Sequence, residues 1–287
     1  MGFYLTKFKN RKTEFKFIMR NKNVLALILV ILISFSLTSY NRQSKSTKRN
    51  NKIMKWNFKN FKTLTFNYKQ TISSNSLLFD SDDKSKNVTE ISGVLAVEVT
   101  KVNLANIVLK DIVQTNFKLD TLGKQSKLIT QEPTQDMMLI EGLQEDGSVT
   151  GAYNPEFVFF SKVFFPIINK EIGLKNTYAL PLSVPFGAAG STINIKGDNM
   201  ITYVSNDNEL AKLETVINVA EFSEPTNLVD TYTCSLKGNS NYSFNLKKGF
   251  FTNGQIGLKM AMGKKDSDQM DMDMDVKIRL DLKAVKQ

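Results

Sequence analysis

Methionine and aspartate alternate over residues 270–275, M-D-M-D-M-D, and these residue types are suited to binding a metal ion. Thioether sulfur binds Cu(I), and carboxylate oxygen binds Ca²⁺. If the segment is a β-strand, however, sulfurs and carboxylates point to opposite faces, and successive aspartates are about 7 Å apart on theirs. That spacing is too wide for one compact ion site. A strand therefore explains the alternation without a metal, and we expect neither a metal nor a cofactor.

Side chains that commonly carry catalysis are scarce in the rest of the chain, which has no histidine and one cysteine, Cys234. Without histidine there is no Ser–His pair and no base to activate Cys234, so we interpret Cys234 as a small buried hydrophobic residue. Glu98, Glu141 and Glu214 could form a pair of catalytic carboxylates, but nothing in the sequence singles them out. Phosphate-loop and nucleophile-elbow motifs do not occur. The sequence predicts that the protein is not an enzyme.

The positive charge of the chain is concentrated at its N-terminus. The formal net charge is +10, yet residues 1–62 contain 15 Lys and Arg against one acid, Glu14. Residues 63–287 contain 23 basic and 27 acidic residues. The body of the protein therefore offers no general excess of positive charge to a phosphate backbone, and we expect no nucleic-acid partner.

An apolar run of 14 residues, 24–37, follows the basic residues Arg20 and Lys22. It is short for a bilayer span, which needs about 20 residues, and it fits the apolar core of a signal peptide. We expect residues 1–39 to be a signal peptide, with Met19 as an alternative start of translation. The competing interpretation is an uncleaved signal anchor with a basic cytoplasmic tail.

Residues 36–39, S-L-T-S, are similar to the approach to a lipobox, the lipidation motif of bacterial lipoproteins. Tyr40 stands where that motif has its lipid-accepting cysteine, so we do not expect lipidation there. The predicted localisation is export: periplasmic, envelope-associated or secreted. Residues 40–53 are polar and basic without periodicity, which predicts a disordered tether. Such a tether could contact an anionic membrane surface or act only as a spacer.

From residue 54 to residue 287 we expect one mainly β domain, because apolar residues recur with a period of two. In the segment 64–72, for example, Leu64, Phe66 and Tyr68 share one face. Further segments with strand character are 92–102, 106–119, 137–143, 191–195, 200–204, 212–222, 231–236, 242–246 and 255–262. Turns between strands are predicted at Asp198-Asn199, Asp207-Asn208, Gly238-Asn239 and Asn253-Gly254.

The last predicted strand, 270–284, is the longest and alternates strictly between apolar and charged residues. It could extend about 50 Å, and we expect it to pair with 255–262, where Met260 and Met262 share the apolar face. A strand this long with one hydrated face predicts a large, curved antiparallel sheet, arranged as a half-barrel or a sandwich.

Residues 154–168 form the most apolar stretch of the body. Asn154, Pro155 and Glu156 resemble a helix start, so we expect a short helix that ends before Pro166. The Phe and Val content would also suit a strand. Either element must be covered on nearly all sides, as part of the core or as an apolar lid that contacts lipid.

Two segments carry a family resemblance. The sequences F-F-P-I-I-N-K-E-I-G-L-K-N-T-Y at 164–178 and F-N-L-K-K-G-F-F-T-N-G-Q-I-G-L-K-M-A-M-G at 244–263 resemble a β-rich domain of unknown function. That domain occurs in exported bacterial proteins, often lipoproteins. The resemblance covers about residues 60–285 and implies a β-rich fold, but it implies no catalytic residues.

Two functions follow from these expectations. In the first, an exported envelope protein binds an apolar small molecule or a lipid in the concave side of its curved sheet. The predicted ligand-binding residues are Phe157, Phe160, Phe164, Met260, Met262 and Met272. The alternative is a structural or interaction protein of the cell envelope whose core is filled.

Overall fold

The computed structural model describes residues 52–76, 86–120, 122–150, 155–188, 191–207, 209–225, 231–264 and 272–287. Residues 51–287 form a compact unit of their own. The predicted signal peptide and most of the predicted tether lie outside the described residues. Within the described part of the chain, no helix has both the length and the apolar character needed to cross a membrane.

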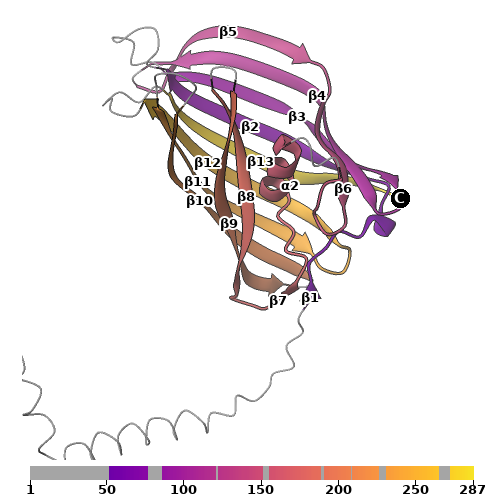
Figure 1. The fold of residues 1–287 in the computed structure, drawn as a ribbon. Coiled ribbons are helices and arrows are strands. Elements are labelled where there is room, and N and C mark those ends of the chain that lie inside the picture. The colour runs from indigo at the N-terminus through magenta and orange to yellow at the C-terminus, as the bar shows by residue number, and fades with distance from the viewer. Residues whose placement is uncertain are drawn as a thin grey trace, which may run out of the picture. The chain divides into compact units, whose positions relative to one another are not determined.

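Antiparallel strands make up most of this unit (Figure 1). The elements are β1 (Lys52–Ile53), the 3-10 helix η2 (Phe58–Asn60), β2 (Thr63–Ser76), β3 (Lys86–Lys101), β4 (Leu104–Leu119), β5 (Gln125–Thr134), β6 (Met137–Gln144), α2 (Pro155–Phe164), β7 (Glu171–Ile172), β8 (Thr177–Ala188), β9 (Ser191–Asp207), β10 (Leu210–Pro225), β11 (Thr231–Asn245), β12 (Phe250–Lys264) and β13 (Met272–Lys286). The prediction of a mainly β fold with a short helix is confirmed.

The main sheet has 11 strands in the order β5-β4-β3-β2-β13-β12-β11-β10-β9-β8, with β6 paired to β4 beside β5. Two runs of consecutive hairpins, β2 to β5 and β8 to β13, join where β13 pairs with β2. The sheet is curved and does not close on itself, because β5 and β8 remain at its two ends (Figure 1). A separate two-stranded sheet is formed by β1 and β7.

The alternation along β13 divides its side chains between two environments. Ile278 and Leu280 are buried on the concave face, whereas Lys277 and Arg279 are exposed on the outer face. The predicted pairing with β12 is confirmed, with Met274 opposite Met260. Because burial of one face selects the register, the strict period of two made this strand predictable.

A bulge and close packing accompany the curvature of the sheet. β4 carries one extra residue opposite Gly93, and Asp111 in this bulge has a φ of 51°. The extra residue lets both Leu109 and Ile112 face the core, and bulges of this kind bend a strand. On β12, a Cβ at position 254 would lie 3.1 Å from the ring of Tyr242, so a larger residue there would require the ring to shift by a few tenths of an ångström.

Three of the four predicted turns are wrong, because β9, β11 and β12 run through them without interruption. Asn199 is a buried residue within β9, where it makes a hydrogen bond to the helix. At Gly238 a Cβ would lie 2.7 Å from the Leu258 side chain, and Gly254 packs under Tyr242. These residues mark close packing inside long strands. The connection predicted near Asp207-Asn208 is confirmed, since β9 ends at Asp207 and β10 begins at Leu210.

Two strands at the ends of the sheet, β5 and β8, were not predicted. β8 contains Pro181 and Pro185, which favour other conformations in a sequence pattern but are tolerated in an edge strand. A residue without an N–H group weakens the hydrogen-bonding edge, and this discourages pairing with other chains.

Between β6 and β8 the chain crosses from one end of the sheet to the other, and α2 lies in this crossover. The helix contacts β8, β6 and β12, so it occupies the gap between the two ends of the sheet (Figure 1). Below it, aromatic side chains fill one half of the concavity. We call this the filled half; its aromatic members include Trp56, Phe58, Phe61, Phe66, Phe165 and Phe251.

Candidate functional site

The C-terminal end of α2 is held against the concave face by two polar side chains of the sheet. Asn199 Nδ2 donates to the carbonyl of Lys162 at 3.0 Å, and the Tyr242 hydroxyl donates to the carbonyl of Val163. Both carbonyls belong to the last turn of the helix, where no intrahelical donor remains. Burial raises the pKa of Tyr242, so this hydroxyl keeps its proton for the bond. These two hydrogen bonds therefore attach the C-terminal end of α2 to β9 and β11.

Phe165, the residue that follows α2, is packed among aromatic rings and so fixes the direction of the helix. The Phe165 ring lies 5.4 Å from the rings of both Trp56 and Phe251 and 5.7 Å from that of Phe66. The C-terminal end of α2 thus points into the filled half, and its N-terminal half points away from it. Lys162 Nζ donates to the Pro181 carbonyl on β8, and burial lowers the pKa of this lysine.

The N-terminal half of α2 remains partly exposed although every residue from 157 to 160 is apolar. Phe157 and Phe160, two of the predicted ligand residues, are half-buried against the core cluster. Phe164, the third, is buried and stacks on Phe160 with ring centroids 5.3 Å apart. The structure therefore places Phe164 in the core and leaves Phe157 and Phe160 with accessible ring surface.

The inward side chains of β13 are most deeply buried in the middle of the strand, and those on the side away from the filled half are partly exposed. Along β13, Leu280 is 1% exposed and Ile278 is 5% exposed, whereas Val276 and Met274 are half-buried. On β12, which pairs with β13, Met260 is half-buried in the same way. We call this region, with inward positions Ile72, Val276, Met274 and Met260, the distal half. Its floor is apolar and partly accessible.

Two predicted methionines lie one step further along the same pair of strands. Met262 of β12 is directly opposite Met272 of β13 in the register, so the backbone brings them together with the Met260–Met274 pair. The side chains of Met262 and Met272 lie outside what the structure describes. Four of the six predicted residues can thus be placed by their side chains, and the last two by the backbone alone.

The distal half has a polar side as well. On β3 and β4, the Thr89 hydroxyl donates to Asn116 Oδ1 at 2.8 Å, and Gln114 Nε2 donates to the same oxygen at 3.2 Å. The register places these side chains on the concave face, since Thr89 is opposite Ile72 and Gln114 is opposite Ile91. On β2, the Tyr68 hydroxyl donates to Gln70 Oε1 at 2.6 Å. The sequence did not predict this cluster, because its residues lie on different strands and only the pairing of those strands brings them together.

The candidate catalytic groups do not converge among the described residues. Cys234 is buried, and burial raises the pKa of its thiol. Glu98 on β3 pairs with Lys110 at 2.7 Å, and that hydrogen bond raises the pKa of Lys110. Glu214 on β10 is separated from β3 by four strands in the sheet order. In the described ranges, no group of three His, Cys, Asp or Glu side chains could hold a metal ion.

Comparisons with known proteins add little. No family model and no curated protein sequence match the chain. A solved structure described as "Lipid-protein interactions in lipovitellin" is similar, with a TM-score of 0.44 and 8% sequence identity. The similarity covers 78% of this chain and 25% of that chain, so this chain spans about a quarter of the length of its structural neighbour. The resemblance to exported β-rich proteins stays a prediction.

Proposed function

We propose that this protein is a non-catalytic binding protein that holds an apolar ligand, such as the acyl chain of a lipid, in the distal half of its concave sheet. One observation carries the proposal: inward apolar side chains on β12 and β13 change from buried at Ile278 to half-buried at Met274 and Met260. A protein core normally excludes water from such residues. A ligand that covered them would remove this apolar surface from water.

Two further features support the proposal. Phe157 and Phe160 add partly accessible aromatic side chains from the N-terminal half of α2, the end of the helix away from the filled half. The hydrogen-bonded Thr89, Gln114 and Asn116 lie on the same concave face, on strands β3 and β4. Ligand sites commonly combine a mostly apolar lining with a few polar groups that fix orientation. This combination suits a ligand with an apolar chain and a polar head. We further propose that the protein acts in an exported state, as the apolar run at 24–37 suggests.

The alternative, a structural protein with a filled core, has support from the other half of the concavity. Trp56 is fully buried and packs within 5.4 Å of Phe165 and Phe251. Around Trp56 the concave side is therefore occupied by aromatic rings. The two functions therefore differ only in what happens in the distal half, and an experiment must be aimed there.

Binding of the fluorescent fatty acid cis-parinaric acid by the purified protein tests the proposal. We expect Met260→Glu to weaken binding at least about tenfold, because a carboxylate beside an acyl chain must be desolvated. Val216→Glu is the matched control, since it makes the same type of change at an outward position that is 51% exposed. Emission from Trp56, the single tryptophan, reports that the filled half stays intact. Equal affinity of both variants, or no binding by the unmodified protein, would contradict the proposal.

A further inference from the structure

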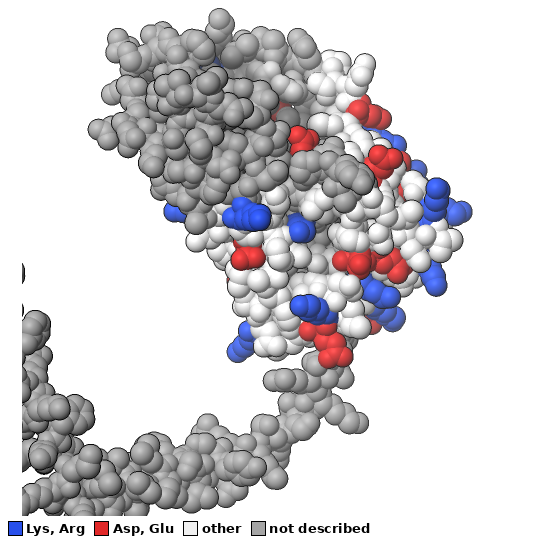
Figure 2. Space-filling view, viewed as in Figure 1, with Lys and Arg blue, Asp and Glu red and all other residues white. Residues whose placement is uncertain are grey.

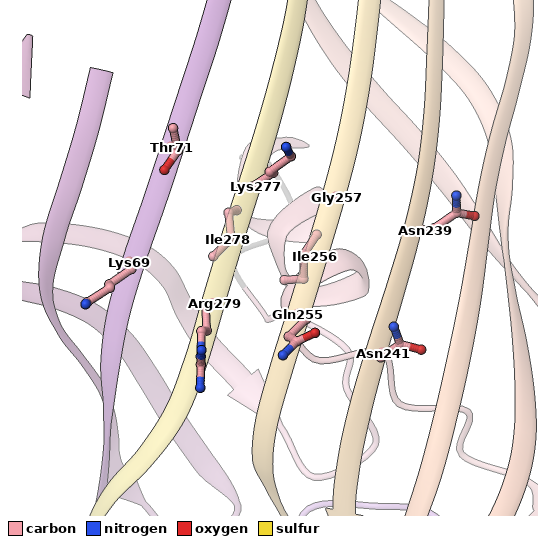
Figure 3. Close-up of a pocket in the computed structure, with 10 residues that line it drawn as sticks. All are labelled: Lys69, Thr71, Asn239, Asn241, Gln255, Ile256, Gly257, Lys277, Ile278 and Arg279. Atoms are coloured by element: carbon pink, nitrogen blue, oxygen red, sulfur yellow. The ribbon is translucent and has the colours of Figure 1, made fainter. Parts of the chain in front are cut away.

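On the outer face of the sheet, a depression of about 380 Å³ crosses strands β2, β13, β12 and β11 (Figure 3). Its lining carries three cationic side chains, three amides and no acid. These residues are Lys69, Lys277, Arg279, Asn239, Asn241 and Gln255. The depression lies on the face opposite to the proposed apolar site. From this site we propose a second binding function: recognition of the phosphate group of a small soluble molecule, such as a sugar phosphate.

The floor of the depression is Gly257, and neither packing nor backbone geometry requires glycine there. The nearest heavy atom to a Cβ at this position would be the carbonyl oxygen of Asn239 at 3.4 Å, an ordinary contact distance. A glycine in the middle of a strand weakens it, and one reason to keep it is close approach of a ligand. Gly238, on the concave face, is different: a Cβ there would lie 2.7 Å from Leu258, so close packing accounts for that glycine. Packing does not account for Gly257 on the outer face.

The charges around Gly257 also work against stability of the sheet. Lys69 of β2 is directly opposite Arg279 of β13. Lys237 of β11 is directly opposite Lys259 of β12, next to the depression. Like charges directly opposite on one face of a sheet repel each other. An anion bound between these strands would relieve that repulsion.

Arg279 is oriented for such a role. Its Nε donates to Asp281 Oδ2 at 2.7 Å, and Nη2 lies 3.5 Å from Asp281 Oδ1. Among the described residues Nη1 makes no hydrogen bond, so it can donate to a ligand, and guanidinium groups suit phosphate oxygens. Figure 3 shows Lys277 and Arg279 along β13, with Gln255 beside Arg279 on β12. Amide groups of Asn239 and Asn241 lie on the β11 side.

The surroundings favour a compact anion over an extended one. Acidic residues flank the depression on the same face: Glu90 is opposite Thr71, Glu214 is opposite Asn241, and Asp275 is opposite Lys259. A flat anionic membrane would meet these carboxylates and be repelled. Figure 2, which views another part of the surface, likewise shows basic and acidic side chains interspersed. No acid is among the described residues that line the depression, although Arg279 also pairs with Asp281, which lies outside the lining.

Isothermal titration of the purified protein with inorganic pyrophosphate and with glucose 1-phosphate, at low ionic strength, tests the proposal. We expect Lys277→Gln to weaken binding about tenfold, as loss of one charge-assisted hydrogen bond should. Gly257→Val should abolish binding, because it fills the floor of the depression. Its melting temperature should be equal or higher, since valine favours a strand and its Cβ has space. Lys196→Gln, an exposed lysine on β9, is the control and should leave binding unchanged.

Vesicles that contain phosphatidylglycerol distinguish the source of the phosphate group. We expect the sugar phosphate to bind and the vesicles to bind no better to the unmodified protein than to Gly257→Val. Vesicle binding that is lost in Gly257→Val, without binding of either soluble phosphate, would overturn the proposal of a small soluble ligand. Failure of pyrophosphate and glucose 1-phosphate to bind, or equal binding by all three variants, would also overturn it. Because parinaric acid binding uses the other face, it should be the same in Gly257→Val as in the unmodified protein.

Discussion

Tyr68 and Tyr242 are two buried tyrosines of the sheet whose hydroxyls make hydrogen bonds. Both lie on the concave face, and both hydroxyls donate hydrogen bonds, Tyr68 to Gln70 and Tyr242 to the last turn of α2. Burial raises the pKa of each. In the unfolded chain the same hydroxyls regain the ordinary tyrosine pKa of about 10. The folded state therefore binds more protons than the unfolded state once the pH exceeds that value.

We predict that the free energy of unfolding decreases as the pH rises above about 10, by up to about 1.4 kcal/mol per pH unit for each buried tyrosine. The stability is fully present below the ordinary pKa and is lost toward the raised one. Urea unfolding at several alkaline pH values measures the slope. Tyr68→Phe should reduce the slope, because one titrating group is removed. An identical slope in this variant would show that other groups cause the alkaline loss.

At the scale of elements, the segment from Met54 to Phe61 contributes buried side chains to the core of the filled half. Trp56 packs against Phe58, Phe61, Phe165 and Phe251 with ring centroids between 5.4 and 6.3 Å apart. Its backbone is anchored too, since the Trp56 N–H donates to the Glu145 carbonyl at 2.8 Å. Sequence analysis assigned this segment to the domain but gave it no role, because it has neither a strand period nor a helical one.

We predict that Trp56→Ala lowers the free energy of unfolding by about 3–5 kcal/mol, the usual loss when a large buried aromatic residue is truncated. Lys59→Ala, an exposed change three residues later, should alter it by less than about 0.5 kcal/mol. Chemical denaturation followed by circular dichroism measures both. A loss below 1 kcal/mol for Trp56→Ala would mean that this segment does not seal the core.

The elements also show what a single sequence can reveal. Alternation identified β13 and its pairing with β12, because one face of each strand is buried, and the structure supplies the register. The turn predictions at Asn199 and Gly238 are wrong, because the roles of these residues depend on contacts with α2 and with β12. Edge strand β8 was not predicted, because its two prolines are residues that do not favour a strand. Contacts between distant segments decide these positions, and a local pattern does not contain them.

For the whole molecule, the open sheet and α2 divide the concave side into two regions with different properties. The filled half is packed with aromatic rings, and the distal half leaves apolar side chains such as Met260 and Met274 partly accessible. The sequence predicted some aromatic and methionine residues of this concavity, such as Phe160 and Met260, but could not say which of them would be covered. Phe164 was expected in the site and is buried in the core, while Phe157 and Phe160 keep accessible surface.

Native mass spectrometry of the protein, purified without detergent, tests most directly whether the distal half holds an apolar ligand. We predict a mass increment of one acyl-chain ligand on the unmodified protein. The double variant Met260→Glu and Met274→Glu should lack this increment while its Trp56 emission stays unchanged. A bare mass for the unmodified protein, even after incubation with excess fatty acid, would contradict the account.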